Sequence, residues 1–193
     1  MRLPSAAHTS RSWRIHQLTP DFRLEDVWAL PTPGGPDDFP RLVNWLASRD
    51  DPARASASRA VRALWAARWA AGQLLGWDGP DDLREAPPGP NFRALPFTSL
   101  YLLEDEWAAE VANQTMHGVM HIGWVPNGTG GYHGQMAVLV KPNGLLGTAY
   151  MAAIRPFRRL IVYPLATREI GRAWRALGAN PGTGTHIAQT ADS

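Results

Sequence analysis

Two runs of alternating apolar side chains, separated by the turn NGTGG, occupy residues 116–140. Alternation with a period of two is typical of β-strands with one buried face, and a Gly-rich turn suits a hairpin. The large apolar residues that share one face are Met116, Met120, Ile122 and Trp124 on the first strand, and Tyr132, Met136, Val138 and Val140 on the second. A sheet covered on one side buries its more apolar face. We therefore expect an antiparallel hairpin with its methionine-bearing face turned toward the core.

His117, His121 and His133 fall on the opposite face of this predicted hairpin. On an extended strand, the Cα atoms of His117 and His121 would lie about 13 Å apart. Zinc binds imidazole nitrogens at ~2.0–2.1 Å, so this spacing does not favour a shared metal site. We interpret the three as surface or interface histidines. The alternative is that a β-bulge turns one inward as a general acid or base, because imidazole titrates near neutral pH.

Further strands and helices are predicted on both sides of the hairpin. The predicted strands span residues 12–18, 97–103, 106–114 and 145–154, and 106–114 is equally compatible with a helical turn. Apolar spacing predicts helices over 37–48 and 56–76, a helical turn over 19–30 and a long loop over 77–96. A closing helix over 156–178 is expected to open at Pro156 and to kink at Pro164.

This order of elements predicts an α+β domain. An antiparallel sheet that curls around the closing helix would enclose a cavity, as in helix-grip folds. Residues 1–12 are expected to be a flexible arm, residues 13–177 one domain, and residues 178–193 a disordered tail of small and polar residues.

Composition argues against several classes of function. The chain has no cysteine, which removes disulfides and thiolate metal sites, and its formal net charge of +2 does not favour nucleic-acid binding. No apolar run reaches the ~18 residues of a membrane span, so we expect a cytoplasmic protein. No phosphate-binding loop, dinucleotide fingerprint or metal-binding motif is present, so neither a cofactor nor a metal is expected. The sequence is compatible with a homodimer.

Residues 136–174 resemble a bacterial domain family of unknown function. The resemblance rests on a strand that ends in Lys141-Pro142-Asn143-Gly144-Leu145, followed by Gly147, Tyr150 and the pair Pro156-Phe157. Members occur alone or fused behind short-chain-dehydrogenase-like NAD-binding domains. The family is similar to the START and polyketide-cyclase (SRPBCC) superfamily, which implies a helix-grip fold around an apolar cavity. Relatives often carry a His after the Pro-Phe pair, where this chain has Arg158-Arg159.

These observations define a candidate ligand site and candidate catalytic residues. The expected cavity-lining residues are Tyr101, Met116, Met120, Trp124, Tyr132, Met136 and Tyr150. The candidates for proton transfer are Tyr150, Glu110, Asn113, His117 and His121. We expect the cavity to hold a small hydrophobic or aromatic molecule, and the protein to act as a polyketide-cyclase-like cyclase or isomerase. The alternative is a non-catalytic binding or carrier protein, or an accessory partner of a reductase.

Overall fold

The computed structural model describes residues 1–47, 97–113 and 116–179. Its centre is a curved six-stranded antiparallel sheet of order β1-β2-β6-β5-β4-β3. The strands are β1 (Arg2–Leu3), β2 (Arg23–Ala29), β3 (Thr98–Leu102), β4 (Glu106–Asn113), β5 (Met116–Pro126) and β6 (Tyr132–Pro142). The helices are α1 (Ala6–Thr9), α2 (Ile15–Leu18), a 3-10 turn η1 (Pro36–Asp38), α3 (Phe39–Ala47), α5 (Gly144–Phe157), a π-helical turn η2 (Arg158–Val162) and α6 (Tyr163–Ala179).

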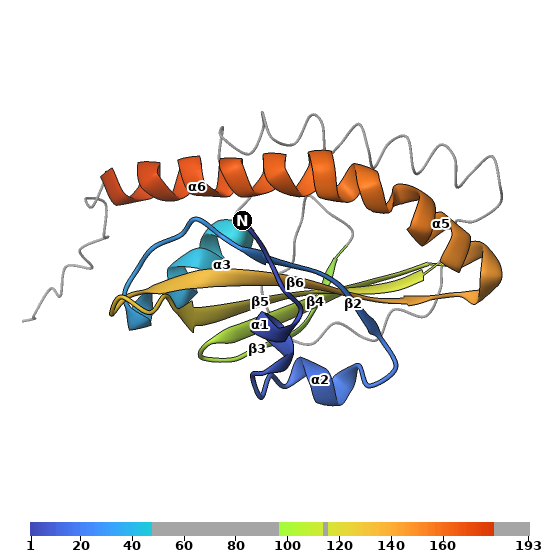
Figure 1. Cartoon of the computed structure of the whole chain (residues 1–193). Coiled ribbons are helices and arrows are strands. Elements are labelled where there is room, and N and C mark those ends of the chain that lie inside the picture. Colours follow the sequence, from blue (N-terminus) through green and yellow to red (C-terminus); the bar gives the residue numbers. More distant parts are fainter. Residues whose placement is uncertain (48–96, 114–115, 180–193) are drawn as a thin grey trace, which may run out of the picture.

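The helices cover the two faces of the sheet unequally (Figure 1). Helices α3 and α6 lie over one face, which we name the α6 face. The short helices α1 and α2 lie against the other, which we name the N-terminal face. The chain is therefore an α+β protein with a long C-terminal helix, as the sequence predicted. None of the helices in the described residues is both long and apolar enough to cross a membrane.

The predicted hairpin is confirmed as β5 and β6. Ile122 pairs with Met136 and Trp124 with Gly134, which places these side chains on the α6 face. The turn between the strands contains Gly128 and Gly130 at positive φ, a conformation that residues with a Cβ rarely adopt. The predicted strands 97–103 and 106–114 correspond to β3 and β4, and the predicted helix 37–48 corresponds to α3.

Two predictions near the N-terminus are wrong. Residues 12–18, predicted as a strand, contain the short helix α2, and the predicted helical turn over 19–30 contains strand β2. In β2, Val27 packs on the N-terminal face and Trp28 on the α6 face. Because both faces of the strand are buried, neighbouring residues are both apolar and the alternation that marks a strand is lost.

The predicted strand 145–154 is also wrong, because these residues belong to helix α5. Short apolar runs do not distinguish a strand from a buried helix. Pro156 lies inside α5 instead of opening the closing helix, and the π-helical turn η2 joins α5 to α6. Pro164 is the second residue of α6 and comes directly after the π-helical turn, and it has no N–H to donate to a carbonyl of the preceding turn. The irregularity that we expected at Pro164 lies just before it, in the turn η2.

The predicted flexible arm packs against the sheet. Arg2 and Leu3 pair with Trp28 and Val27 of β2, and His8 of α1 is fully buried. Three predicted segments, the helix 56–76, the loop 77–96 and the tail from residue 180 onward, lie outside the described residues. Residues 178 and 179, assigned to the tail, end α6.

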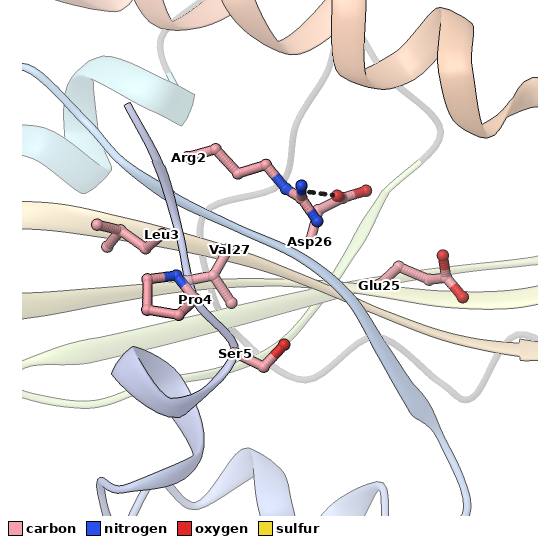
Figure 2. Close-up of a pocket in the computed structure, with 7 residues that line it drawn as sticks. All are labelled: Arg2, Leu3, Pro4, Ser5, Glu25, Asp26 and Val27. Carbon is pink, nitrogen blue, oxygen red and sulfur yellow. Dashed lines mark ion pairs between the residues drawn. The ribbon is translucent and has the colours of Figure 1, made fainter.

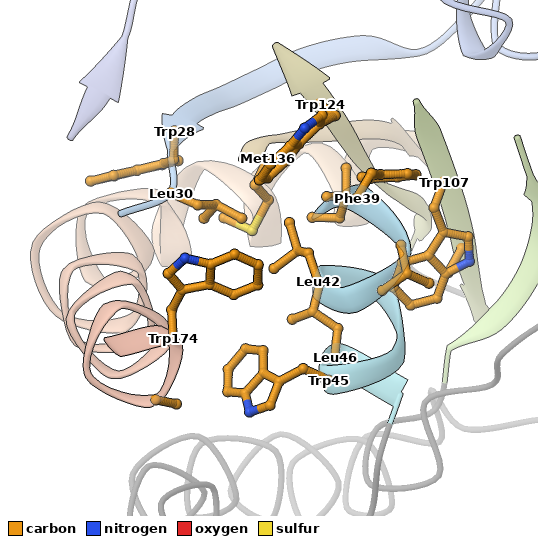
Figure 3. Close-up of a cluster of buried hydrophobic side chains, with 14 residues drawn as sticks. Trp28, Leu30, Phe39, Leu42, Trp45, Leu46, Trp107, Trp124, Met136 and Trp174 are labelled. Carbon is orange, nitrogen blue, oxygen red and sulfur yellow. The ribbon is translucent and has the colours of Figure 1, made fainter. Parts of the chain in front are cut away.

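Two apolar clusters sandwich the sheet. The cluster on the α6 face is rich in aromatic residues and is drawn in Figure 3. It consists of Trp28, Leu30, Phe39, Leu42, Val43, Trp45, Leu46, Trp107, Ala109, Ile122, Trp124, Met136, Ala173 and Trp174. The cluster on the N-terminal face consists of Trp13, Ile15, Val27, Ala108, Val119, Val125, Ala137 and Leu139. The first segment of the chain therefore completes a second core layer.

Replacing Gly171 by Ala should lower the free energy of unfolding by about 1–3 kcal/mol. A Cβ at this position of α6 would lie 2.5 Å from Cγ of Pro31, whose ring has little freedom to move. This loss would outweigh the ~1 kcal/mol by which Ala is favoured over Gly in a helix. Urea denaturation tests it, with Gly178→Ala as the matched control, because a Cβ there meets nothing within 4 Å. Equal stability of the two variants would contradict the close approach of α6 to Pro31.

Candidate functional site

Trp28 differs from other tryptophans on the α6 face in its hydrogen bonding. The indole Nε1 of Trp124 donates to the Gly35 carbonyl (2.9 Å) and that of Trp174 to the Pro33 carbonyl (2.8 Å). The indole Nε1 of Trp28 is buried and has no hydrogen-bond partner. A buried donor without an acceptor costs free energy, so such a group in a native protein calls for an explanation.

Asp26, two residues before Trp28, anchors the π-helical turn to the sheet. Its carboxylate is fully buried and accepts a hydrogen bond from Nε of Arg159 (2.6 Å). It also lies 3.5 Å from Nη2 of Arg158 and 3.6 Å from Nε of Arg2. A π-helical turn interrupts the regular ladder of a helix and is frequent at functional sites. Here it presents two consecutive arginines to one carboxylate.

Arg158 contributes a second buried donor without a partner. Its Nη2 approaches the carboxylates of Glu25 and Asp26, whereas its Nε is buried without an acceptor. The ring of Tyr163, the first residue of α6, lies 5.5 Å from the ring of Trp28. Burial raises the pKa of Tyr163 to about 12, so its hydroxyl keeps its proton at neutral pH and remains a donor. We name Trp28, Arg158 and Tyr163 the donor junction.

A pocket of about 430 Å³ opens at the edge of the sheet beside this junction (Figure 2). Its wall includes Arg2, Glu25 and Asp26, and the last two are the carboxylates that Arg158 contacts. The sequence predicted a cavity between the sheet and the closing helix instead. On the described part of the α6 face, buried side chains pack into a continuous apolar cluster (Figure 3).

A chain of hydrogen bonds runs through the N-terminal face. Nε2 of His121 lies 2.8 Å from Oε2 of Glu106, and Nδ1 of His121 lies 3.1 Å from Nε2 of His8. The Glu106 carboxylate also accepts from the Tyr101 hydroxyl (2.9 Å) and the Arg14 amide (2.9 Å). We name His8, His16, His121, Glu106 and Tyr101 the histidine cluster. His16 belongs to it because its ring lies 4.8 Å from that of His8.

The partners of Glu106 determine which nitrogen donates and which accepts in each of these hydrogen bonds. Burial alone would raise the pKa of Glu106, but hydrogen bonds from His121, the Arg14 amide and Tyr101 outweigh it and lower the pKa. An ionised carboxylate only accepts, so we assign the Nε2 proton of His121 to the bond with Glu106. Nδ1 of His121 then accepts from Nε2 of His8. Nδ1 of His8 is left as a buried acceptor without a partner.

His8 and His121, the two fully buried histidines of the cluster, are neutral at pH 7. Burial, together with the neighbouring His121 and His16, lowers the pKa of His8 to about 3. Burial also lowers the pKa of His121, against the opposing influence of Glu106. The interpretation of His121 as a surface histidine is therefore wrong, since α1 and the segment before α2 cover it. Its assignment to the face opposite the methionines is confirmed.

A second histidine–glutamate pair lies further along the same two strands. Nε2 of His117 lies 2.7 Å from Oε2 of Glu110, and the ring of Phe22 packs 5.0 Å from that of His117. Unlike His121, His117 is partly exposed. The residues that the structure describes contain no group of three or more histidines or carboxylates suited to hold a metal ion.

The structure divides the predicted site residues between the two faces. Met120, Trp124, Tyr132 and Met136 pack together on the α6 face. Tyr101, Glu110, His117 and His121 lie on the N-terminal face. Tyr150 is half-buried on α5, Met116 is half-buried at the start of β5, and Asn113 ends β4. The predicted lining and the predicted proton-transfer groups therefore do not form one site.

Sequence reasoning missed the residues that make the two polar sites specific. Asp26 stands in the segment LEDVWAL, where a carboxylate within an apolar run was a signal of a buried ion pair. His8 and Glu106 gave no such signal, because their partner His121 lies 113 and 15 residues away.

Comparison with known proteins places the chain in a family. No curated protein and no solved structure matches it. One family model, described as a protein of unknown function (DUF2867), matches residues 18–165. This match spans β2, the hairpin, α5 and the start of α6, and includes Asp26, Trp28 and Arg158 of the junction region. The chain therefore belongs to the DUF2867 family.

Proposed function

We propose that this protein binds a small, largely apolar molecule that carries an oxygen acceptor, with the acceptor at the donor junction. The observation that carries the proposal is the pair of buried N–H groups without an acceptor, Trp28 Nε1 and Arg158 Nε. Ligand sites are mostly apolar and contain a few polar groups that fix orientation. The junction combines such groups with the aromatic cluster of the α6 face. A carbonyl or carboxylate oxygen would accept from both N–H groups.

The arrangement of sheet and closing helix supports the same function. A curved antiparallel sheet facing a long C-terminal helix is similar to the helix-grip fold of the START and polyketide-cyclase superfamily, whose members hold apolar ligands between sheet and helix. The ligand would enter from the pocket at the β1–β2 edge, whose wall contains Asp26. Arg2 borders this pocket with a half-exposed side chain, so its movement costs little burial.

Binding without catalysis is the better supported form of this function. A cyclase or isomerase needs groups that transfer protons beside the bound molecule. The histidine–glutamate pairs lie on the other face of the sheet, with the strands between them and the donor junction. Trp28, Arg158 and protonated Tyr163 donate hydrogen bonds but do not act as bases at neutral pH. A carrier that serves a reductase, the alternative that the family resemblance implies, would suit a ligand with a carbonyl group.

Replacing Trp28 by Phe should weaken binding of 2-naphthoate at least about tenfold, because the variant keeps the ring but loses the N–H donor. Binding of 2-methylnaphthalene, which has the same apolar body and no acceptor, should change less than about twofold. Isothermal titration calorimetry with the full chain measures both. Native mass spectrometry of the purified protein shows whether a molecule with an oxygen acceptor is retained.

The matched control is Trp13→Phe. Trp13 is also buried and its Nε1 also lacks a partner, but it lies on the N-terminal face. This variant should bind 2-naphthoate like the wild type. An equal loss in both variants, or no binding of either naphthalene together with no retained molecule, would refute the proposal.

A further inference from the structure

The first 22 residues are attached to the sheet by apolar packing and by several polar contacts. The apolar region consists of Trp13 and Ile15, which pack into the cluster of the N-terminal face. Among the polar contacts, that of His8 with His121 is fully buried. The others are the Arg14 amide on Glu106, Gln135 on the Ala7 carbonyl, the N-terminus on the Ala29 carbonyl, and the ion pairs of Arg2 with Asp26 and of Asp21 with Lys141. Strand β1 adds two paired residues at the edge of the sheet. We name residues 1–22 the N-terminal segment.

We propose that the contact of His8 with His121 is a proton-sensitive latch, so that acid releases the N-terminal segment and uncovers that face of the sheet. The geometry alone requires the contact to be neutral. One imidazole must donate and the other must accept, and the accepting Nδ1 of His121 has no room for a proton while His8 Nε2 points at it. A proton on His121 would place two N–H groups opposite each other and break the bond.

A proton on His8 is opposed in a different way. The remaining nitrogen, Nδ1, is buried without an acceptor, and an added N–H would be equally unpaired. The nearest ring is that of His16, at 4.8 Å, and a second imidazole offers no negative charge. The carboxylate of Glu106 is separated from His8 by the ring of His121. A charged His8 therefore favours the open form, in which water solvates it.

Other titratable or charged groups around the latch do not reverse this preference. They are His16 on α2, Glu106 on β4, Asp105 before it, Tyr101 on β3, and Arg11, Arg14 and His133 around Trp13 and the adjoining edge. Glu106 and Asp105 favour a charged His121, but burial and His16 oppose it. The pKa of both latch histidines is lowered in the closed form.

A fall in pH therefore favours the open form. A histidine with a lowered pKa stabilises the closed form fully above its ordinary pKa, near 6.5, and this contribution is lost as the pH falls toward the lowered value. Between pH 7 and pH 5, the lowered pKa of His8 shifts the opening equilibrium roughly 25-fold, and the lowered pKa of His121 shifts it further in the same direction. Glu106 does not contribute in this range, because its ordinary pKa lies lower.

Hydrogen–deuterium exchange of the full chain tests the latch. Between pH 7 and pH 5, after correction for intrinsic exchange rates, amides of α1 and α2 should lose at least roughly 25-fold of protection, whereas amides of β5 and β6 should keep theirs. Equal loss over the whole sheet would mean global unfolding and would overturn the proposal. Unchanged protection of α1 and α2 would overturn it as well.

His8→Gln separates the latch from general acid sensitivity. Gln can still donate to His121 but cannot titrate, so the loss of protection in this variant should be roughly 25-fold smaller than in the wild type. His117→Gln is the matched control, because His117 lies on the same strand and pairs with Glu110 instead of with a histidine, and it should retain the full wild-type loss. If His8→Gln does not fold, NMR titration of the wild type decides the question. The rings of His8 and His121 should then take up protons together with the opening of α1, and independent titration in the closed form would refute the latch.

Discussion

Replacing Asp26 by Ala should lower the free energy of unfolding by about 3–5 kcal/mol, one of the two largest effects expected for a single side chain in this protein. The carboxylate is fully buried, and the side chains of Arg158 and Arg159 are only 12% and 21% exposed. Without Asp26, Arg159 Nε has no carboxylate to donate to, and Arg158 keeps only Glu25. One largely buried charge would be left without a carboxylate and the other with a single one. Urea denaturation at pH 7 measures the loss.

Glu25→Ala is the matched control for this experiment. Glu25 is the neighbouring residue and contacts Arg158 at 3.4 Å, but water reaches its carboxylate. We expect that variant to lose about 1 kcal/mol or less. The double variant Asp26→Ala with Arg159→Ala should be more stable than the sum of the two single losses predicts, because no unpaired Arg159 charge remains. A loss below 1 kcal/mol for Asp26→Ala would contradict this prediction, because it would show that water solvates Arg158 and Arg159 when the carboxylate is removed.

Long elements of this fold could be predicted from sequence, because their patterns are regular over many residues. The β5–β6 hairpin alternates through eleven residues on each strand and has glycines where the turn needs positive φ. Helix α3 has an apolar stripe that a single face explains. The assignment of the methionine-bearing face to the α6 side followed from the same alternation. In the hairpin one face carries the larger apolar side chains, although both faces are buried.

Short or doubly buried elements could not be predicted in this way. Helices α1 and α2 have four residues each, too few to display a period, and β2 is buried on both faces. The π-helical turn depends on the contact of Arg158 and Arg159 with Asp26, more than 130 residues earlier. Tertiary contacts, not local propensity, fix these elements.

The same limit applies to the candidate sites. His117 and His121 stand out in the sequence, but the burial of His121 depends on a segment more than 100 residues away. An N-terminus of small and polar residues gave no sign that it would cover a sheet. The donor junction is likewise assembled from β2 and the two ends of the π-helical turn. None of its residues stands out in the sequence. Only the buried N–H groups of Trp28 and Arg158 that lack acceptors identify the site.

Replacing Glu106 by Ala should cost about 3–5 kcal/mol of unfolding free energy, because three donors lose their acceptor at once. They are the His121 imidazole, the Tyr101 hydroxyl and the Arg14 amide. Glu106 is 4% exposed, so water cannot replace the carboxylate at most of these groups. The lowered pKa of Glu106 means that its contribution is complete above its ordinary pKa, near 4.5, and is lost as the pH falls below that value. The difference between wild type and variant should therefore shrink between pH 5 and pH 3.

Glu110→Ala provides the control, since Glu110 lies on the same strand and also binds a histidine. Its partner His117 is 32% exposed and is resolvated when the carboxylate is removed, so the expected loss is about 1 kcal/mol. Chemical denaturation of both variants and the wild type across this pH range separates two explanations. If the carboxylate matters as the acceptor that organises the histidine cluster, only Glu106→Ala shows the large loss at neutral pH. If the loss comes only from shortening a side chain on this face of β4, both variants lose stability equally. The difference in stability between wild type and variant then does not depend on pH.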